Sequence, residues 1–309
     1  MIPFKQLRIV FFGTPDFAVA SLKALVDAGA NVVAAVTAPD KPAGRGMQLQ
    51  ASAVKQYAVA HNLLVLQPEK LKAPDFIEQL IELKADVQVV VAFRMLPEQV
   101  WNMPLMGTIN VHASLLPQYR GAAPINWAII NGETETGVTT FKLQHTIDTG
   151  NILMQQTISI LPDDNVGSLY EKLMNAGADL LISTIQGMAE GSINELPQTP
   201  AATEKHAPKI FKEHLEIKWD RPVQGVHNLI RGLSPHPAAF TYLNGKLIKI
   251  YKSHYVVEFN EEVYGEYETD NKTYLRFSCI DGWLYVDELQ QEGKKKMDIT
   301  AFLLGFRKQ

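Results

Sequence analysis

The chain has 309 residues, of which 46% are hydrophobic and 20% are charged, a composition that excludes extensive disorder and predicts one large or two moderate domains with a sizeable core. Its formal net charge of −4 at pH 7 argues against indiscriminate binding of nucleic acids. The single cysteine, Cys279, excludes an intramolecular disulfide and a cysteine-rich zinc site, and it fits a reducing compartment.

The first part of the chain alternates short apolar runs with stretches of helical periodicity. Strands that are buried on both faces read as such apolar runs, and helical crossovers join parallel strands. The predicted strands are 8–12, 31–37, 63–66 and 87–92, and the predicted helices are 16–28, 51–61 and 75–83. This order predicts an α/β fold with a doubly wound, mostly parallel, Rossmann-like sheet, in which ligands bind beyond the carboxyl ends of the strands.

The stretch Asn110–Gly121 follows the last of these segments and predicts a strand that enters a proline-containing loop. Because successive side chains of a strand point to opposite faces, Asn110 and His112 share one face. An amide can donate to a developing oxyanion, an imidazole can move a proton near neutral pH, and Asp148 offers a carboxylate in a turn further along. These residue types alone do not separate acyl transfer from other proton-transfer chemistry, and a buried histidine is often only a core residue.

The second part of the chain begins after a long predicted helix at 167–190. Residues 196–208 contain several prolines and no apolar period, which predicts a linker. A predicted helix at 223–233 precedes short strands at close spacing, with a hairpin turn at Asn244–Gly245, and this pattern indicates a small OB-like β-barrel. We therefore predict a catalytic domain at 1–195, a linker at 196–208 and a C-terminal domain at 209–309.

A longer motif carries a resemblance to a known family. The stretch that begins at Asn110 reads Asn-x-His-x-Ser-Leu-Leu-Pro-x-Tyr-Arg-Gly, and Asp-Thr-Gly follows at 148–150. Together with Phe-Gly-Thr-Pro-Asp-Phe at 12–17, these residues resemble the 10-formyltetrahydrofolate-dependent formyltransferase family. The loop Pro-Asp-Lys-Pro-Ala-Gly-Arg-Gly at 39–46 is typical of the branch that acts on tRNA, and the resemblance extends over essentially the whole chain.

The resemblance implies an enzyme that transfers a formyl group from 10-formyltetrahydrofolate to the α-amino group of methionine on initiator methionyl-tRNA, for translation initiation. Asn110 would donate a hydrogen bond to the oxyanion that forms at the formyl carbon. His112 would hold this oxyanion as an imidazolium or move a proton from the amine to the leaving nitrogen. Asp148 would orient His112 and accept a proton, directly or through a water.

The resemblance also implies two binding sets. Folate would contact the loop residues Ser114, Leu115, Leu116 and Pro117. The tRNA would contact Arg45, Lys41 and Lys209. The alternatives are a packed turn for the first set and ordinary solvated basic residues for the second. Arg94 stands where the family has a glycine, so the shape of the pterin pocket beside it stays open.

The implied partners are initiator methionyl-tRNA and folate, and the implied chemistry needs no metal, no membrane and no obligate protein partner. No apolar run approaches the roughly 20 residues that cross a bilayer. The first residues do not have a signal-peptide pattern. We therefore expect a cytoplasmic protein.

Several other functions remain to be weighed. The nearest is a sugar N-formyltransferase, which uses the same folate chemistry but has no need of the loop at 39–46. A purine-pathway formyltransferase has no use for the second domain, and an RNA-binding protein has no use for the set Asn110, His112 and Asp148. A dinucleotide-dependent oxidoreductase is disfavoured because Pro15 removes a backbone donor from the first turn, which also lacks Gly-x-Gly-x-x-Gly.

Overall fold

The structure is a computed structural model that describes residues 2–43, 48–199 and 203–306. The chain folds into two compact units, each of which gathers several segments. Unit 1 comprises Met1–Arg120, Gly137–Ile158 and Tyr170–Lys205, and unit 2 comprises Gly121–Thr136, Ser159–Leu169 and His206–Gln309. The domain bounds expected from the sequence stay a prediction.

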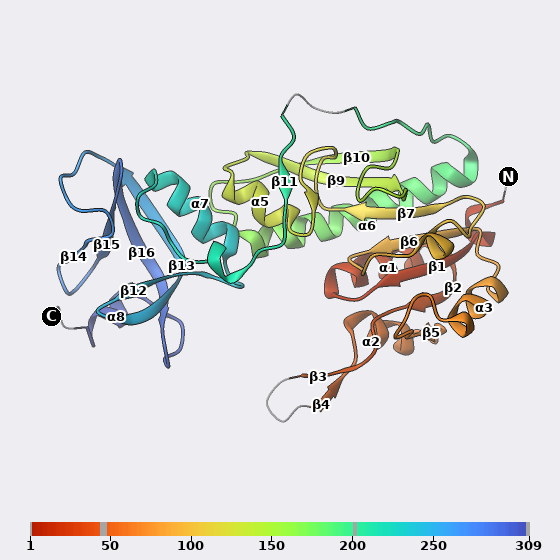
Figure 1. Ribbon diagram of the computed structural model, residues 1–309, viewed down its shortest axis with the longest axis horizontal. Helices are drawn as coiled ribbons and strands as arrows, with labels where there is room; N and C mark the ends of the chain where they lie inside the picture. The colour runs from red at the N-terminus through yellow and green to blue at the C-terminus, as the bar shows by residue number, and fades with distance from the viewer. Residues whose placement is uncertain (1, 44–47, 200–202, 307–309) are drawn as a thin grey trace. The chain divides into compact units, whose positions relative to one another are not determined.

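Unit 1 contains a sheet of seven strands within the described residues, in the order β10-β9-β7-β6-β1-β2-β5 (Figure 1). The strands are β1 (Arg8–Gly13), β2 (Asn31–Val36), β5 (Val65–Leu66), β6 (Val87–Val91), β7 (Thr108–His112), β9 (Glu135–Lys142) and β10 (Ile152–Ser159). The strands from β5 to β7 are parallel, and β9 runs antiparallel to β7. The predicted mostly parallel α/β sheet is confirmed.

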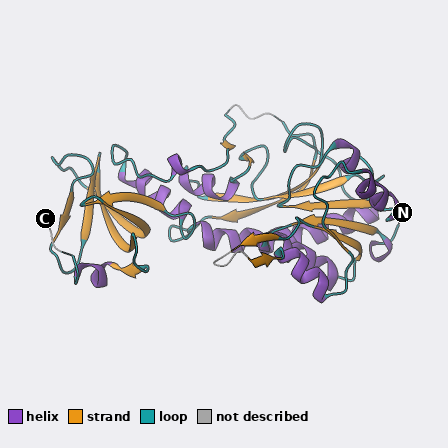
Figure 2. Cartoon of the chain, turned by 60° about the horizontal axis from the view of Figure 1, so that its bottom comes forward, coloured by secondary structure: helices purple, strands orange, loops and turns teal. Residues whose placement is uncertain are grey.

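Helices cover both faces of this sheet (Figure 2). On one face, Phe12 and Val90 pack in a buried cluster with Leu80 of α3. On the other face, Val111 of β7 lies against α6, where a methyl group added at Gly177 would come within 3.0 Å of its side chain. The helices of unit 1 are η1 (Phe4–Gln6), α1 (Asp16–Asp27), α2 (Ala53–Ala60), α3 (Pro74–Glu82), α4 (Glu98–Trp101) and most of α6 (Val166–Glu190).

The loop expected around residues 39–50 instead contains a short hairpin, β3 (Lys41–Ala43) and β4 (Gln48–Gln50). Lys41 pairs with Gln50 and Pro42 with Leu49. Proline lacks a backbone donor, and its presence argues against a strand inside a sheet. A two-stranded ribbon has an outer edge on which such a residue is tolerated, and the sequence does not reveal this position in advance.

Unit 2 is built around an antiparallel sheet in the order β12-β13-β16-β15-β14, with β17 beside β16, and the sheet curls into a half-barrel. Val226 and Ile230 of α7 pack in its core with Phe277 and Leu284. Asn244 and Gly245 have positive φ angles of 48° and 73°, as the predicted hairpin turn requires. The strands are β12 (Ala239–Leu243), β13 (Lys246–Val257), β14 (Tyr267–Thr269), β15 (Leu275–Cys279), β16 (Gly282–Gln291) and β17 (Met297–Asp298).

Helices and short elements complete the chain. In unit 2 the core also buries Cys279, and this burial raises the pKa of its thiol to about 12. The thiol is therefore neutral at physiological pH.

Among the described residues, none of the helices combines the length and the apolar character that a membrane crossing demands. The remaining elements are α5 (Pro124–Ile130), α7 (Val223–Leu233), α8 (Ile299–Leu303), η2 (Lys212–His214) and the short strands β8 (Arg120–Gly121) and β11 (His206–Ala207).

Replacing Leu80 with alanine is expected to lower the free energy of unfolding of unit 1 by about 2–5 kcal/mol, because the truncation leaves a cavity in the core. Leu80 is 1% exposed, whereas Leu105 is 99% exposed and provides a matched control. The change Leu105→Ala is expected to cost less than about 0.5 kcal/mol. Urea unfolding followed by circular dichroism measures both, and equal effects would contradict this packing.

Candidate functional site

Strand β7 presents Asn110 and His112 on the same face of the sheet. Asn110 lies opposite Phe141 and His112 opposite Thr139 of β9, while Val90 of β6 pairs with Asn110 on the other edge. The side chain of His112 is buried, and that of Asn110 is part-exposed. Within the described parts of the chain, the Asn110 amide has no hydrogen-bond partner, so it is available to a ligand.

The contacts of the His112 ring set the roles of its two nitrogens. Nε2 lies 3.0 Å from the carbonyl oxygen of Tyr119, and Nδ1 lies 4.0 Å from Oδ2 of Asp148. A carbonyl oxygen only accepts, so the hydrogen-bond network assigns a proton to Nε2, and Nδ1 of the neutral ring carries the lone pair. Nδ1 can therefore take up a proton, and the imidazolium that results faces the Asp148 carboxylate.

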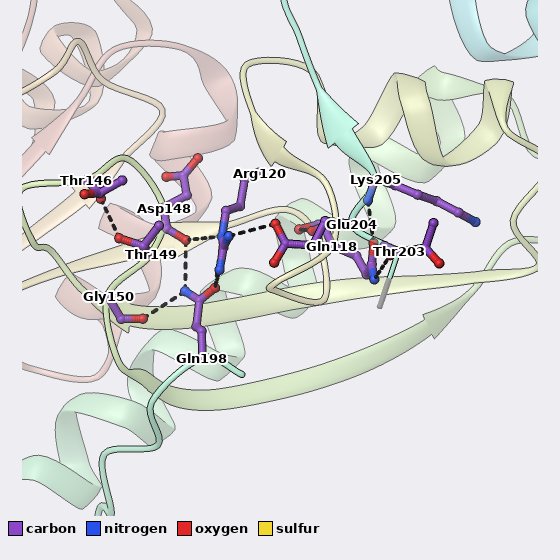
Figure 3. Close-up of polar contacts among 11 residues, drawn as sticks. Gln118, Arg120, Thr146, Asp148, Thr149, Gly150, Gln198, Thr203, Glu204 and Lys205 are labelled. Carbon is purple, nitrogen blue, oxygen red and sulfur yellow. Dashed lines mark hydrogen bonds and ion pairs between the residues drawn. The ribbon is translucent and has the colours of Figure 1, made fainter. Parts of the chain in front are cut away.

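Asp148 lies in a turn whose main-chain carbonyl groups accept hydrogen bonds from the side chains of Arg120 and Gln198 (Figure 3). Its carbonyl oxygen accepts hydrogen bonds from Arg120 Nε at 3.1 Å and from Gln198 Nε2 at 2.9 Å. Gln198 Nε2 also donates to the carbonyl oxygen of Gly150 at 2.9 Å. The φ angle of Asp148 is 54°, a left-handed conformation that aspartate tolerates better than most residues. The turn is thus fixed through its backbone, which leaves the carboxylate directed at His112.

The loop after β7 is packed against β9. Ser114 is fully buried and its hydroxyl donates to the carbonyl oxygen of Gln118 at 2.6 Å. Thr139 donates to the Ser114 carbonyl oxygen at 2.7 Å, and Leu116 is 3% exposed. Leu115 and Pro117 keep part of their surface exposed. The structure brings the four predicted folate residues together next to His112, and their contact with folate stays a prediction.

The predicted tRNA residues lie in separate places. Arg45 lies outside the described residues. Lys41 is exposed on β3 of unit 1. Lys209 is exposed in unit 2, with its ammonium 5.7 Å from the centre of the Phe211 ring. Their contact with tRNA stays a prediction.

The segment after β6 forms an open pocket with a volume of about 690 Å³. Arg94 belongs to its wall, and its guanidinium donates to the carbonyl oxygen of Glu69 at 2.8 Å and to that of Pro68. Arg94 therefore fastens a neighbouring loop through its backbone. Leu71, Lys72, Met95, Pro97, Glu98 and Gln99 complete the wall. Among the described residues no cluster of histidine, cysteine or carboxylate side chains could hold a metal ion.

Sequence reasoning overlooked Arg120 and Gln198. Arg120 belongs to the motif that carries the resemblance, so its position could have been noted. Gln198 falls in the polar segment interpreted as a linker, and an isolated glutamine there gives no signal. In the structure the two side chains bond each other, with Arg120 Nη2 donating to Gln198 Oε1 at 2.6 Å.

Comparison with known proteins gives matches over nearly the whole chain. The family model described as formyl transferase matches residues 7–185, and the model of the formyl transferase C-terminal domain matches residues 209–307. A methionyl-tRNA formyltransferase of Bacteroides fragilis is 52% identical and covers 98% of this chain and 96% of its own length. That of Parabacteroides distasonis is 53% identical, with 98% and 97% covered.

Solved structures with the same fold are more distant in sequence. One is WlaRD, a sugar 3N-formyl transferase crystallised with dTDP and 5-N-formyl-THF, with a TM-score of 0.68 and 22% identity over 94% of this chain and 99% of that chain. Another is an N-formyltransferase of Helicobacter canadensis in complex with folinic acid and dTDP-3-aminofucose. Its TM-score is 0.69 at 23% identity, with 92% and 99% covered. At such identities the likeness concerns the fold alone.

Replacing Gly150 with alanine is expected to distort the Asp148 turn and to destabilise unit 1 by about 1–3 kcal/mol. The added methyl group would lie 1.6 Å from the carbonyl oxygen of Lys142, a backbone atom that cannot rotate away. The control is Gly225→Ala on the exposed side of α7, where nothing lies within 4 Å of the new group. This control should stabilise its helix by about 0.5–1 kcal/mol. Thermal unfolding of both variants measures the two effects, and a gain of stability in Gly150→Ala would contradict the geometry.

Proposed function

Because the chain belongs to the methionyl-tRNA formyltransferase family, we propose a specific role for each residue of its site in formyl transfer. The protein is a one-carbon transferase, and its reaction moves a formyl group to the α-amino group of methionine on initiator methionyl-tRNA. The observation that carries the assignment of the site is that β7 holds Asn110 and His112, while the turn between β9 and β10 brings the Asp148 carboxylate to 4.0 Å from His112.

The formyl donor in this proposal is 10-formyltetrahydrofolate, which supplies the carbon that is transferred. Two proteins with the same fold were solved with formylated reduced folates, which supports a folate in this role. The part-exposed Asn110 amide suits such a formyl donor, because its N–H, which has no partner among the described residues, can donate a hydrogen bond to the formyl oxygen. The loop of Ser114, Leu115, Leu116 and Pro117 would line the folate with backbone groups and apolar surface.

Asn110 stabilises the negative charge that develops on the formyl oxygen as the amine attacks. The Asn110 amide is held in place because β7 is hydrogen-bonded to β6 and β9, so little reorganisation is needed at the moment of reaction. One such donor typically contributes about 2.7–4 kcal/mol to transition-state stabilisation.

His112 and Asp148 handle the protons. Nδ1 of His112 accepts the proton that the attacking amine releases, while Nε2 stays bonded to the Tyr119 carbonyl oxygen. The imidazolium gains a favourable interaction with Asp148 Oδ2, 4.0 Å away. His112 then returns the proton to the nitrogen of the leaving group, so the protein ends each cycle in its starting state. No covalent bond to the protein is needed.

The remaining binding assignments concern tRNA. Lys41, Arg45 and Lys209 would contact phosphates, since each ammonium or guanidinium group can neutralise one backbone charge. Lys41 and Lys209 are exposed, as such a contact requires. One structural neighbour is a sugar formyl transferase and another was solved with an amino-sugar nucleotide. The 45–53% identity of curated methionyl-tRNA formyltransferases over nearly the whole chain nevertheless favours tRNA as the acceptor.

Replacing Asn110 with alanine is expected to lower kcat about 10²–10³-fold, because the oxyanion loses its donor. Transfer of labelled formyl from 10-formyltetrahydrofolate to methionine-charged initiator tRNA measures the effect. Asn102, which is exposed at the end of α4, serves as the control, and Asn102→Ala should leave kcat unchanged. An unaltered rate in Asn110→Ala would refute the assignment.

Replacing Arg45 or Lys41 with alanine is expected to raise KM for tRNA while kcat and folate binding stay as in the unaltered protein. Each lost phosphate contact should make the dependence of log affinity on log salt shallower by about 1. Kinetics at several salt concentrations measure this slope, with elongator tRNA and an amino-sugar nucleotide as parallel acceptors. Transfer to the sugar but not to tRNA would favour a sugar N-formyltransferase instead.

A further inference from the structure

The chain leaves unit 1 through a polar stretch whose described residues contact the Asp148 turn and the loop that follows β7. We name the residues 196–199 and 203–205 the exit segment. Gln198 reaches the Asp148 turn, and Glu204 pairs with Arg120 Nη1 at 3.2 Å (Figure 3). Lys205 reaches the loop that carries Tyr119. A segment that would only join two domains has no reason to make these contacts.

Gln198 uses both ends of its side-chain amide. The nitrogen donates to the carbonyl oxygens of Asp148 and Gly150, both at 2.9 Å. The oxygen accepts from Arg120 Nε at 3.1 Å and Nη2 at 2.6 Å. A guanidinium only donates and a carbonyl only accepts, so the surroundings fix which end of the amide is which. These hydrogen bonds therefore hold the side-chain amide of Gln198 in a single orientation.

The exit segment also supports His112, through the loop that carries Tyr119. The carbonyl oxygen of Lys205 accepts from the backbone N–H of Tyr119 at 2.6 Å, and the Tyr119 carbonyl oxygen is the group that holds His112 Nε2. Gln118 adds two contacts, since its side chain accepts from the Lys205 N–H at 2.8 Å and donates to the Thr203 carbonyl oxygen at 3.0 Å. The same short segment thus anchors both the histidine and the carboxylate.

We propose that Gln198 is a positioning residue of the transfer reaction, which fixes the Asp148 carboxylate in front of His112 through the backbone of the Asp148 turn. This inference rests on the proposed function. The residues 144–147 that lead into the turn are exposed, so packing contributes little on that side of the turn. The gap of 4.0 Å between Nδ1 and Oδ2 depends on that position, and a misplacement of about 1 Å can cost 10²-fold in rate.

The change Gln198→Glu separates positioning from simple anchoring. A carboxylate still accepts from Arg120, so the exit segment stays attached. It has no hydrogen to donate, and it repels the carbonyl oxygens of Asp148 and Gly150, so the turn loses both of its bonds from Gln198 and keeps the bond from Arg120 Nε. If Gln198 only anchors the segment, Gln198→Glu should behave like the unaltered enzyme. If it positions Asp148, Gln198→Glu should be as slow as Gln198→Ala.

The experiment compares kcat, KM and melting temperature for Gln198→Ala and Gln198→Glu. We expect kcat to fall up to about 100-fold in both variants, with KM for tRNA and folate within about twofold. The matched controls are Gln186→Ala and Gln186→Glu on the exposed side of α6, which should leave all three quantities unchanged. A normal kcat in Gln198→Glu, or a rise of KM at constant kcat, overturns the proposal.

A double-mutant cycle with Asp148→Asn tests the route of the effect. If Gln198 acts through Asp148, Gln198→Ala adds little to the loss already caused by Asp148→Asn, whereas fully additive losses overturn the proposal. A second readout does not depend on the reaction. The NMR chemical shifts of the His112 ring should differ between Gln198→Ala and the unaltered protein, because the Asp148 carboxylate, 4.0 Å from Nδ1, moves away from the ring. Unchanged chemical shifts of this ring also overturn the proposal.

These readouts distinguish the two levels of inference. Failure of the unaltered protein to formylate any acceptor would refute the proposed function alone, and the NMR chemical shifts of the His112 ring would still decide whether Gln198 positions Asp148. Activity of the unaltered protein with no effect of either Gln198 change would refute the positioning role alone.

Discussion

Strand β7 is hydrogen-bonded to β6 along one edge and to β9 along the other, and this double pairing determines which face of the sheet receives each of its side chains. Because the side-chain period of a strand is two, a slip of one residue would exchange the faces. Asn110 and His112 would then point at α6, where Gly177 leaves space only for Val111. The packing of an apolar face thus determines the position of two polar groups.

The site is held mainly by backbone carbonyl groups. The carbonyl oxygen of Tyr119 orients His112, that of Asp148 receives Arg120 and Gln198, and that of Lys205 holds Tyr119. Main-chain groups offer fixed acceptors that stay neutral at any pH, so they orient an imidazole and a carboxylate without adding charge. Arg120 brings a positive charge to this part of unit 1, and Glu204 pairs with it.

Sequence reasoning succeeded where a pattern repeats and failed where one contact decides. The apolar run of β6 and the amphipathic α7 predicted their elements within a residue, because burial imposes a period on the chain. Asn110, His112 and Asp148 came from residue chemistry and a family motif, and their assigned roles are proposals. Gln198 gave no signal, since a side chain that bonds a distant backbone carbonyl needs no neighbours of a given kind. The hairpin at Pro42 was not predicted either, because the sequence there has no periodic pattern.

Unit 2 takes α5 from the middle of the chain and α7 from a much later segment. The two helices touch so closely that a methyl group at Gly232 would lie 2.6 Å from the side chain of Ile130. During translation at about 5–20 residues per second, α5 leaves the ribosome seconds before its partner exists. Its apolar side stays uncovered for that interval, so the nascent chain passes through an aggregation-prone intermediate whose exposed hydrophobic surface a chaperone can bind. A fragment that begins after residue 205 lacks α5, so the surface of α7 that α5 covers in the full chain is exposed.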